Sequence, residues 1–128
     1  ELLIAVELPI ARKNATHFFH EFARRHGDYA IAGVAAQAVV DGGAFADLRL
    51  AFFAVGDRPV LADAASTLVK TAITTTLVSE ACVALGEELD PQDDQQASGE
   101  MRRHLAKVLL ARAVATLLGR PELAGRVA

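Results

Sequence analysis

The spacing of apolar residues changes once along this chain, near residue 60, and this change constrains the fold class more than any other feature. Before it, apolar residues alternate or form short runs bounded by glycine and proline, which is typical of strands. After it, they recur every three or four positions, which is typical of helices. The sequence therefore predicts an α+β fold in which a small antiparallel sheet of three to four strands packs on a three-helix layer.

Four segments of the first half are candidate strands: residues 2–8, 17–24, 29–40 and 45–55. The first is expected to end at Pro9, since proline cannot donate to a sheet ladder. The pattern leaves a short amphipathic helix open for residues 17–24. Small side chains dominate residues 29–40, so another element can pack very close to that strand. Asp41-Gly42-Gly43 predicts a tight hairpin turn, because glycine readily adopts positive φ.

Three helices are expected in the second half: residues 62–69, residues 77–89 and a long helix that begins after Ser98 and ends at Gly119-Arg120-Pro121. Ser98 can cap the long helix, and Glu100 in its first turn faces the positive end of the helix dipole. A proline and several acidic residues in the loop 90–94 separate it from the helix before it.

The long helix is expected to pack through one apolar stripe, with its cations at the rim. The expected buried residues are Met101, Leu105, Val108 and Leu109, and the expected rim residues are Arg102, Arg103 and Lys107. We further expect Arg102 or Arg103 to pair with a carboxylate of the loop 90–94 or of the first half of the chain.

Composition bounds the class of protein. With 128 residues, 52% of them hydrophobic, the chain is predicted to be a single domain, residues 1–128, with a core of its own. No apolar run predicts a membrane span, and a net charge of −3 with scattered arginines argues against nucleic-acid binding. One cysteine fits a reducing compartment, so the expected location is the cytoplasm. The chain begins at Glu1 rather than methionine, and we expect it to be a piece of a longer protein.

No catalytic or metal-binding motif is found in the sequence. The four histidines and Cys82 have none of the spacings of known metal sites, and no nucleophile elbow or phosphate-binding loop is present. Cys82 lies among apolar residues and is interpreted as a small buried hydrophobe. We expect neither catalytic residues nor metal ligands in this chain.

A polar cluster, residues 24–28, stands directly before the small-residue segment. One interpretation is a hairpin corner, in which Gly27 permits the bend and Asp28 accepts from nearby backbone donors. The other is that Arg24, Arg25 and Glu21 face a phosphate or carboxylate of a cofactor or partner. The residues alone favour the hairpin corner.

Three ordered motifs carry a family resemblance: FHEFARRHGDYAIAGVAA, ADLRLAFFAVGDRPVLA and SGEMRRHLAKVLLARAVA. Together they resemble the C-terminal domain of the FAD-binding (medium) subunit of molybdenum hydroxylases, the family of carbon monoxide dehydrogenase and xanthine dehydrogenase. The resemblance runs from Glu1 to about Ala115. It implies a domain of the flavoprotein subunit of an FAD-dependent oxidoreductase.

In that family FAD is held mainly by an N-terminal domain with two glycine-rich loops, and neither loop occurs in this chain. The resemblance therefore implies that the FAD-binding N-terminal domain is absent from this chain and is its partner. It also implies an iron–sulfur small subunit with 2Fe-2S clusters and a large subunit with molybdopterin. The C-terminal domain covers FAD, and electrons pass from the clusters through FAD to an acceptor.

The resemblance also implies three cofactor-binding positions. By position, Leu3 would contact FAD from the first strand, and Phe19 falls where the family places an aromatic residue near the isoalloxazine ring. Glu21 stands where many members have lysine, and a carboxylate cannot donate the hydrogen bond that lysine gives. For Phe19, ordinary core packing is the alternative to flavin contact.

Two functions follow from these observations. The first is a domain that does no bond chemistry of its own and covers FAD within a flavoprotein subunit. The alternative is a non-catalytic protein-interaction or assembly domain without a cofactor, in which the small-residue strand and the helical face bind a partner.

Overall fold

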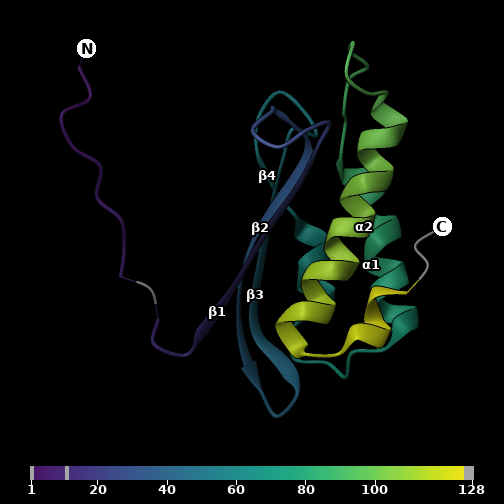
Figure 1. Ribbon diagram of the computed structural model, residues 1–128. Helices are drawn as coiled ribbons and strands as arrows, with labels where there is room; N and C mark the ends of the chain where they lie inside the picture. The colour runs from purple at the N-terminus through teal and green to yellow at the C-terminus, as the bar shows by residue number, and fades with distance from the viewer. Residues whose placement is uncertain (1, 11, 126–128) are drawn as a thin grey trace.

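A four-stranded antiparallel sheet and a helical layer make up the fold. The computed structural model describes residues 2–10 and 12–125. Within these residues the strands are β1 (Ala15–Ala23), β2 (Ala30–Asp41), β3 (Ala44–Phe53) and β4 (Val60–Leu61), and each pairs with the next in sequence. The helical layer contains α1 (Thr75–Glu88), α2 (Gly99–Leu118) and two 3-10 helices, η1 (Asp63–Leu68) and η2 (Pro121–Ala124). The helices cover one face of the sheet (Figure 1), which confirms the expected α+β fold.

The predicted strand at residues 2–8 is wrong. Residues 2–10 are extended but pair with no strand of the described chain, and Leu2, Leu3 and Ile4 are all more than four-fifths exposed. Figure 1 shows this segment standing away from the sheet. Alternating apolar residues are a local signal, whereas a strand also requires a partner with which to pair. The segment predicted at residues 17–24 is a strand and not a helix: residues 17–23 belong to β1, and Arg24 follows its end.

The core lies between β2, β3 and α2. Alternate residues of β2 and β3 point toward the helices and are buried, with Phe45, Leu50 and Phe52 fully enclosed. The small residues of β2 meet a face of α2 that is also rich in alanine. The small residues of this strand predict that another element packs very close to it, and that element is α2.

The buried face of α2 differs from the expected one. Met101 is half-exposed, while Arg102 is 94% buried, its relative exposure being only 6%. The buried residues of the helix include Arg102, Ala106, Leu109, Leu110, Ala113 and Val114. This spacing still follows one helical stripe, but the stripe begins at an arginine, which a search for apolar residues excludes.

The predicted cap, helix stop and hairpin turn form as expected. The Ser98 hydroxyl accepts a hydrogen bond from the Met101 N–H at 3.1 Å, and Gly119 ends α2. Asp41, Gly42 and Gly43 make the β2–β3 turn, where both glycines adopt left-handed backbone angles. The segment 62–69 is helical as expected, though it winds as the 3-10 helix η1.

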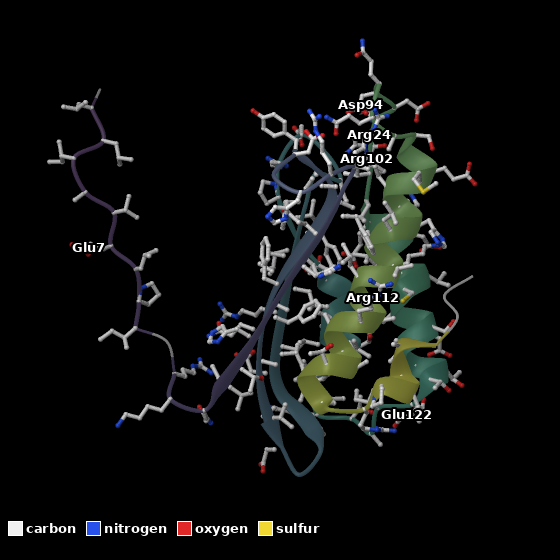
Figure 2. All side chains as sticks on the ribbon, viewed as in Figure 1. Glu7, Arg24, Asp94, Arg102, Arg112 and Glu122 are labelled. Atoms are coloured by element: carbon white, nitrogen blue, oxygen red, sulfur yellow. The ribbon has the colours of Figure 1, made fainter. Side chains whose placement is uncertain are left out.

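Arg102 joins α2 to the sheet and to the loop before the helix (Figure 2). Its guanidinium donates to the carbonyls of Ile31 at 2.7 Å and Ala54 at 3.0 Å. It also pairs with Asp94 at 2.6 Å, which confirms the expected pairing with the acidic loop. A buried guanidinium with three acceptors is well satisfied, so this arginine fixes the position of α2 against β2 and the end of β3.

We predict that Arg102→Ala lowers the free energy of unfolding by about 2 to 4 kcal/mol, because two part-buried carbonyls lose a charged donor and Asp94 loses its ion-pair partner. Arg103→Ala is the matched control: Arg103 makes one hydrogen bond, to the Leu89 carbonyl at 3.2 Å, so its loss should cost about 1 kcal/mol. Urea unfolding measures both. Equal losses in the two variants would contradict the special role of Arg102.

We also predict an acid dependence of stability centred on Asp94. Hydrogen bonds from the Ala97 and Gln96 N–H groups and from Arg102 lower the pKa of Asp94 from 3.8 to about 2. The unfolded chain therefore takes up this proton at higher pH than the folded chain. The stabilising contribution of the carboxylate is complete above about pH 4 and is lost as pH falls toward 2.

Urea midpoints of the wild type and Asp94→Asn test this dependence. The gap between the two proteins should be largest above about pH 4 and should narrow as pH falls to about 2. A gap that stays constant across this range would contradict the prediction.

Candidate functional site

The face of the sheet that the helices leave open carries the candidate site. Successive residues of a strand point to opposite faces, so the residues between the buried positions form this outer face. The strand register aligns them in three rows across β1, β2 and β3. The rows are His17–Gln37–Arg49, Phe19–Ala35–Ala51 and Glu21–Gly33–Phe53.

Two aromatic rings lie flat on the outer face. Phe19 and Phe53 stack with their centroids 5.7 Å apart and their planes 15° from parallel. Phe53 lies over Gly33, where a Cβ atom would overlap the phenyl ring. Glycine at position 33 therefore allows the ring to lie against the strand, and the two aromatics expose an apolar surface.

A hollow of about 660 Å³ lies over the short side chains of Ala35 and Ala51, which share a row with Phe19. Leu61 of β4 and residues 8–10 border it. Its volume is within the range of small-molecule sites, roughly 300 to 1,000 Å³. Short side chains in the middle of a sheet leave room for a flat group to lie close to the backbone.

Polar groups line one side of this hollow. His17, Gln37 and Arg49 form the polar row, and Arg12 pairs with Asp47 at 3.4 Å at the rim. Within the described chain, Arg49 makes no ion pair with a carboxylate. The outer face can therefore offer a flat apolar surface, hydrogen-bonding groups and a positive charge to one ligand.

The structure brings together two of the three residues proposed from the resemblance. Phe19 and Glu21 are both exposed and occupy adjacent rows of the outer face. Leu3 is 81% exposed and belongs to the N-terminal segment, which stands away from the sheet in Figure 1. Phe19 is 62% exposed, so the alternative that it is a core residue is wrong.

Gly33 and Phe53 also belong to this site, although no pattern in the sequence marks them as site residues. Phe53 belongs to a segment of alternating apolar residues. This alternation predicts only that Phe53 and Phe52 lie on opposite faces of the sheet. Its position beside Phe19 depends on the register of three strands, which no local pattern contains.

The polar cluster 24–28 is a hairpin corner, as the residues favoured. Gly27 has a φ of +81°, and the Asp28 carboxylate accepts from the Tyr29 N–H at 2.9 Å. Arg24 donates to the carbonyls of Gln95 and Gln96, and Arg25 pairs with Asp28. Both arginines are thus engaged within the chain, which favours a structural role over recognition of an external anion.

Cys82 is buried and donates from its thiol to the Lys107 carbonyl at 3.4 Å. Burial raises the pKa of this thiol to about 11, although the nearby Lys107 charge opposes the shift. The thiol therefore stays protonated at neutral pH and is a poor nucleophile. Among residues 2–10 and 12–125, no three His, Cys, Asp or Glu side chains are grouped as metal ligands, and no helix is long and apolar enough to span a membrane.

Comparison with known proteins identifies relatives of this fold and surface. The family described as "CO dehydrogenase flavoprotein C-terminal domain" matches residues 17–117, which include all of the outer-face rows. The carbon monoxide dehydrogenase medium chain of Afipia carboxidovorans is 32% identical over 116 residues, which cover 89% of this chain and 40% of that protein. The glyceraldehyde dehydrogenase medium chain of Sulfolobus acidocaldarius is 29% identical, with 88% and 40% covered.

A solved structure gives the same fold. Carbon monoxide dehydrogenase from Hydrogenophaga pseudoflava, in a form that lacks the Mo-pyranopterin moiety of its cofactor, matches with a TM-score of 0.81. The identity is 24%, and the match covers 88% of this chain and 39% of that one. The present chain thus spans about 40% of the length of the curated relatives that it matches.

We predict that Phe19→Ala lowers the free energy of unfolding by only about 1 kcal/mol. The substitution removes one stacking contact, with Phe53, and little buried surface, because the Phe19 side chain is mostly exposed. Phe52→Ala, one residue before Phe53 and fully buried, should cost about 3 to 5 kcal/mol. Urea unfolding compares the two. A loss at Phe19 as large as the loss at Phe52 would show that the exposed ring stabilises the domain itself.

Proposed function

This chain belongs to the CO dehydrogenase flavoprotein C-terminal domain family, and we propose that it is the C-terminal domain of the flavoprotein subunit of a molybdenum hydroxylase. In this role the domain covers FAD and does no bond chemistry of its own. The observation that carries the proposal is the aromatic pair on the outer face, in which Phe19 is 62% exposed, together with a hollow of ligand size over the alanines of its row. An exposed apolar surface of this kind is typical of a binding site.

The residues of the outer face fit a flavin ring. The isoalloxazine is flat and largely apolar, with hydrogen-bonding atoms along one edge, and the outer face offers exposed phenyl rings beside a polar row. Bound FAD would supply the carrier of electrons from iron–sulfur clusters to an acceptor. The chain's own contribution is to hold one side of the ring and keep water from it.

Phe19 and Glu21 have distinct roles in this proposal. The Phe19 ring presents an apolar face on which a flat group can stack. The Glu21 carboxylate, one row further on, accepts hydrogen bonds and disfavours negative charge on a nearby ring. A lysine at this position would have the opposite electrostatic effect.

Leu3 contributes to FAD binding only if the N-terminal segment lies over the outer face in the whole protein. Residues 8–10 already border the hollow, so the chain enters the domain on this side of the sheet. The many exposed apolar side chains between Leu2 and Ile10 need a surface to cover them. We propose the FAD-binding domain of the same subunit as that surface.

The wider assembly belongs to the same proposal. The partners would be the FAD-binding N-terminal domain, an iron–sulfur small subunit with 2Fe-2S clusters and a large subunit with molybdopterin. Substrate oxidation would occur at molybdenum in the large subunit of an enzyme of the carbon monoxide and xanthine dehydrogenase type. The whole enzyme would be located in the cytoplasm. The relatives named as medium chains of dehydrogenases support a subunit of an oxidoreductase.

We predict that Phe19→Ala in the intact flavoprotein subunit weakens FAD retention roughly tenfold, because stacking on an aromatic ring contributes about 1 to 3 kcal/mol. Phe19→Tyr keeps a ring at this position and should retain FAD. Val83→Ala is the matched control, since Val83 is 56% exposed on α1, in the helical layer that covers the opposite face. Flavin absorbance after dialysis measures retention.

Equal flavin content in Phe19→Ala and the wild type would contradict a flavin contact at Phe19. That result would favour the alternative, an assembly domain without a cofactor. Reduced flavin content in Val83→Ala as well would indicate a general loss of folding rather than a specific contact.

A further inference from the structure

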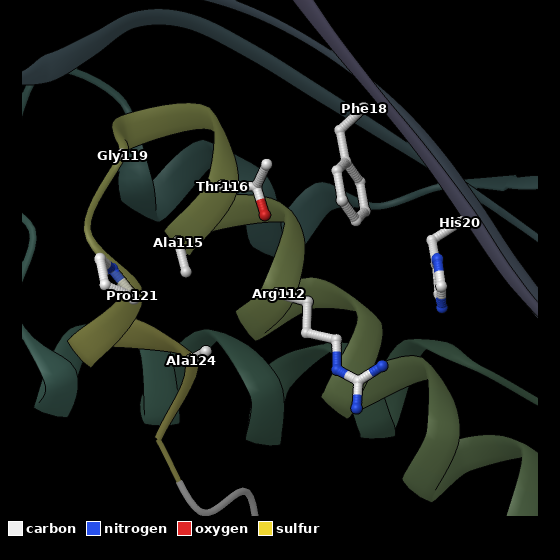
Figure 3. A pocket seen from close by; sticks show the side chains of 8 residues that line it. All are labelled: Phe18, His20, Arg112, Ala115, Thr116, Gly119, Pro121 and Ala124. Carbon is white, nitrogen blue, oxygen red and sulfur yellow. The ribbon is translucent and has the colours of Figure 1, made fainter.

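A second hollow, of about 480 Å³, lies on the other side of β1, between that strand, the C-terminal half of α2 and η2. Figure 3 shows Phe18 and His20 projecting toward Arg112 and Thr116 of α2. Phe18 and Phe19 are consecutive in a strand, so they point to opposite faces of the sheet. This hollow is therefore separate from the outer face, and nothing in the proposed function uses it.

An aromatic row forms one wall of the hollow. The rings of Phe18 and His20 have centroids 6.3 Å apart and planes inclined by 28°, and the rings of His20 and Phe22 are nearly perpendicular with centroids 5.4 Å apart. Pro121 and Ala124 of η2 form an apolar wall on the opposite side. A flat apolar group can lie between these walls and contact both.

Arg112 brings a positive charge to this apolar hollow. Its guanidinium carbon lies 5.2 Å from the centroid of the Phe22 ring, a cation–π contact that restricts its orientation. Arg102 and Arg120 on the same side of the sheet each pair with a carboxylate. Within the part of the chain that the structure describes, Arg112 pairs with none.

The other polar groups of the hollow complement this charge. The Thr116 hydroxyl lies one helical turn after Arg112, and the described lining contains no Asp or Glu. A guanidinium and a hydroxyl next to each other can both donate to one carboxylate. A ligand with a carboxylate and a flat apolar body would thus satisfy both halves of the hollow.

We infer that this hollow binds a small aromatic carboxylate, with the carboxylate on Arg112 and Thr116 and the ring between Phe18 and η2. Phenylacetate is the probe. In a heteronuclear NMR titration of the 128-residue chain, saturable shifts are expected at the amides of Phe18, Thr116 and Ala124. 2-Phenylethanol, which has the same ring without the charge, should bind about tenfold more weakly.

Arg112→Gln should weaken phenylacetate binding about tenfold while leaving the weak binding of 2-phenylethanol unchanged. The matched control is Arg58→Gln: Arg58 is also exposed, but it lies in the loop between β3 and β4, away from the hollow. The Arg58→Gln variant should bind phenylacetate with the same affinity as the wild type. Thr116→Leu, which fills the hollow and leaves Arg112 in place, should abolish binding of both probes.

Three results would overturn the inference. The first is an absence of saturable shifts at the three amides, and the second is equal affinity for phenylacetate and 2-phenylethanol. The third is equal affinity of Arg112→Gln and Arg58→Gln for phenylacetate. Because Phe19 and the outer face take no part, these outcomes are independent of FAD retention by the intact subunit.

Discussion

The buried guanidinium of Arg102 is the interaction on which the arrangement of the layers depends. One side chain joins α2 to the carbonyls of Ile31 in β2 and Ala54 at the end of β3, and to Asp94 in the preceding loop. The same loop accepts Arg24 from the end of β1. Two arginines thus hold the sheet, the helix and the hairpin corner together at one end of the fold, and the alanine-rich contact of β2 with α2 completes the core.

With one face of the sheet covered by the helical layer, the other face is left open. β1 is an edge strand, and its alternation assigns Phe18 to the helical side and Phe19 to the outer face. On the outer face the aromatic pair and the short side chains form a flat surface, because Gly33 allows Phe53 to lie against the strand. The polar cluster 24–28 stands directly before the small-residue strand for a structural reason. It forms the hairpin corner that connects β1 to β2, the strand that packs most extensively on α2.

The sequence predicted the features that depend on local chemistry. The Gly42-Gly43 turn, the Ser98 cap, the stop at Gly119 and the bend at Gly27 each require a particular residue type, and each forms as expected. Features that depend on distant residues were harder to predict. The long helix buries Arg102 because the carbonyls of Ile31 in β2 and of Ala54 after β3, together with Asp94, accept its hydrogen bonds. The segment 2–8 is no strand because none of the described strands pairs with it. The pairing of Phe19 with Phe53 likewise requires the register of three strands.

The central claim is that the outer face of the sheet covers the flavin. A crystal structure of the intact flavoprotein subunit with FAD bound tests it most directly, through the exposed fraction of Phe19, which is 62% in the present chain. We expect the isoalloxazine ring to lie within van der Waals contact of Phe19 and to reduce the exposure of Phe19 to that of a buried residue. A flavin held entirely by other parts of the subunit, with Phe19 still open to solvent, would contradict it.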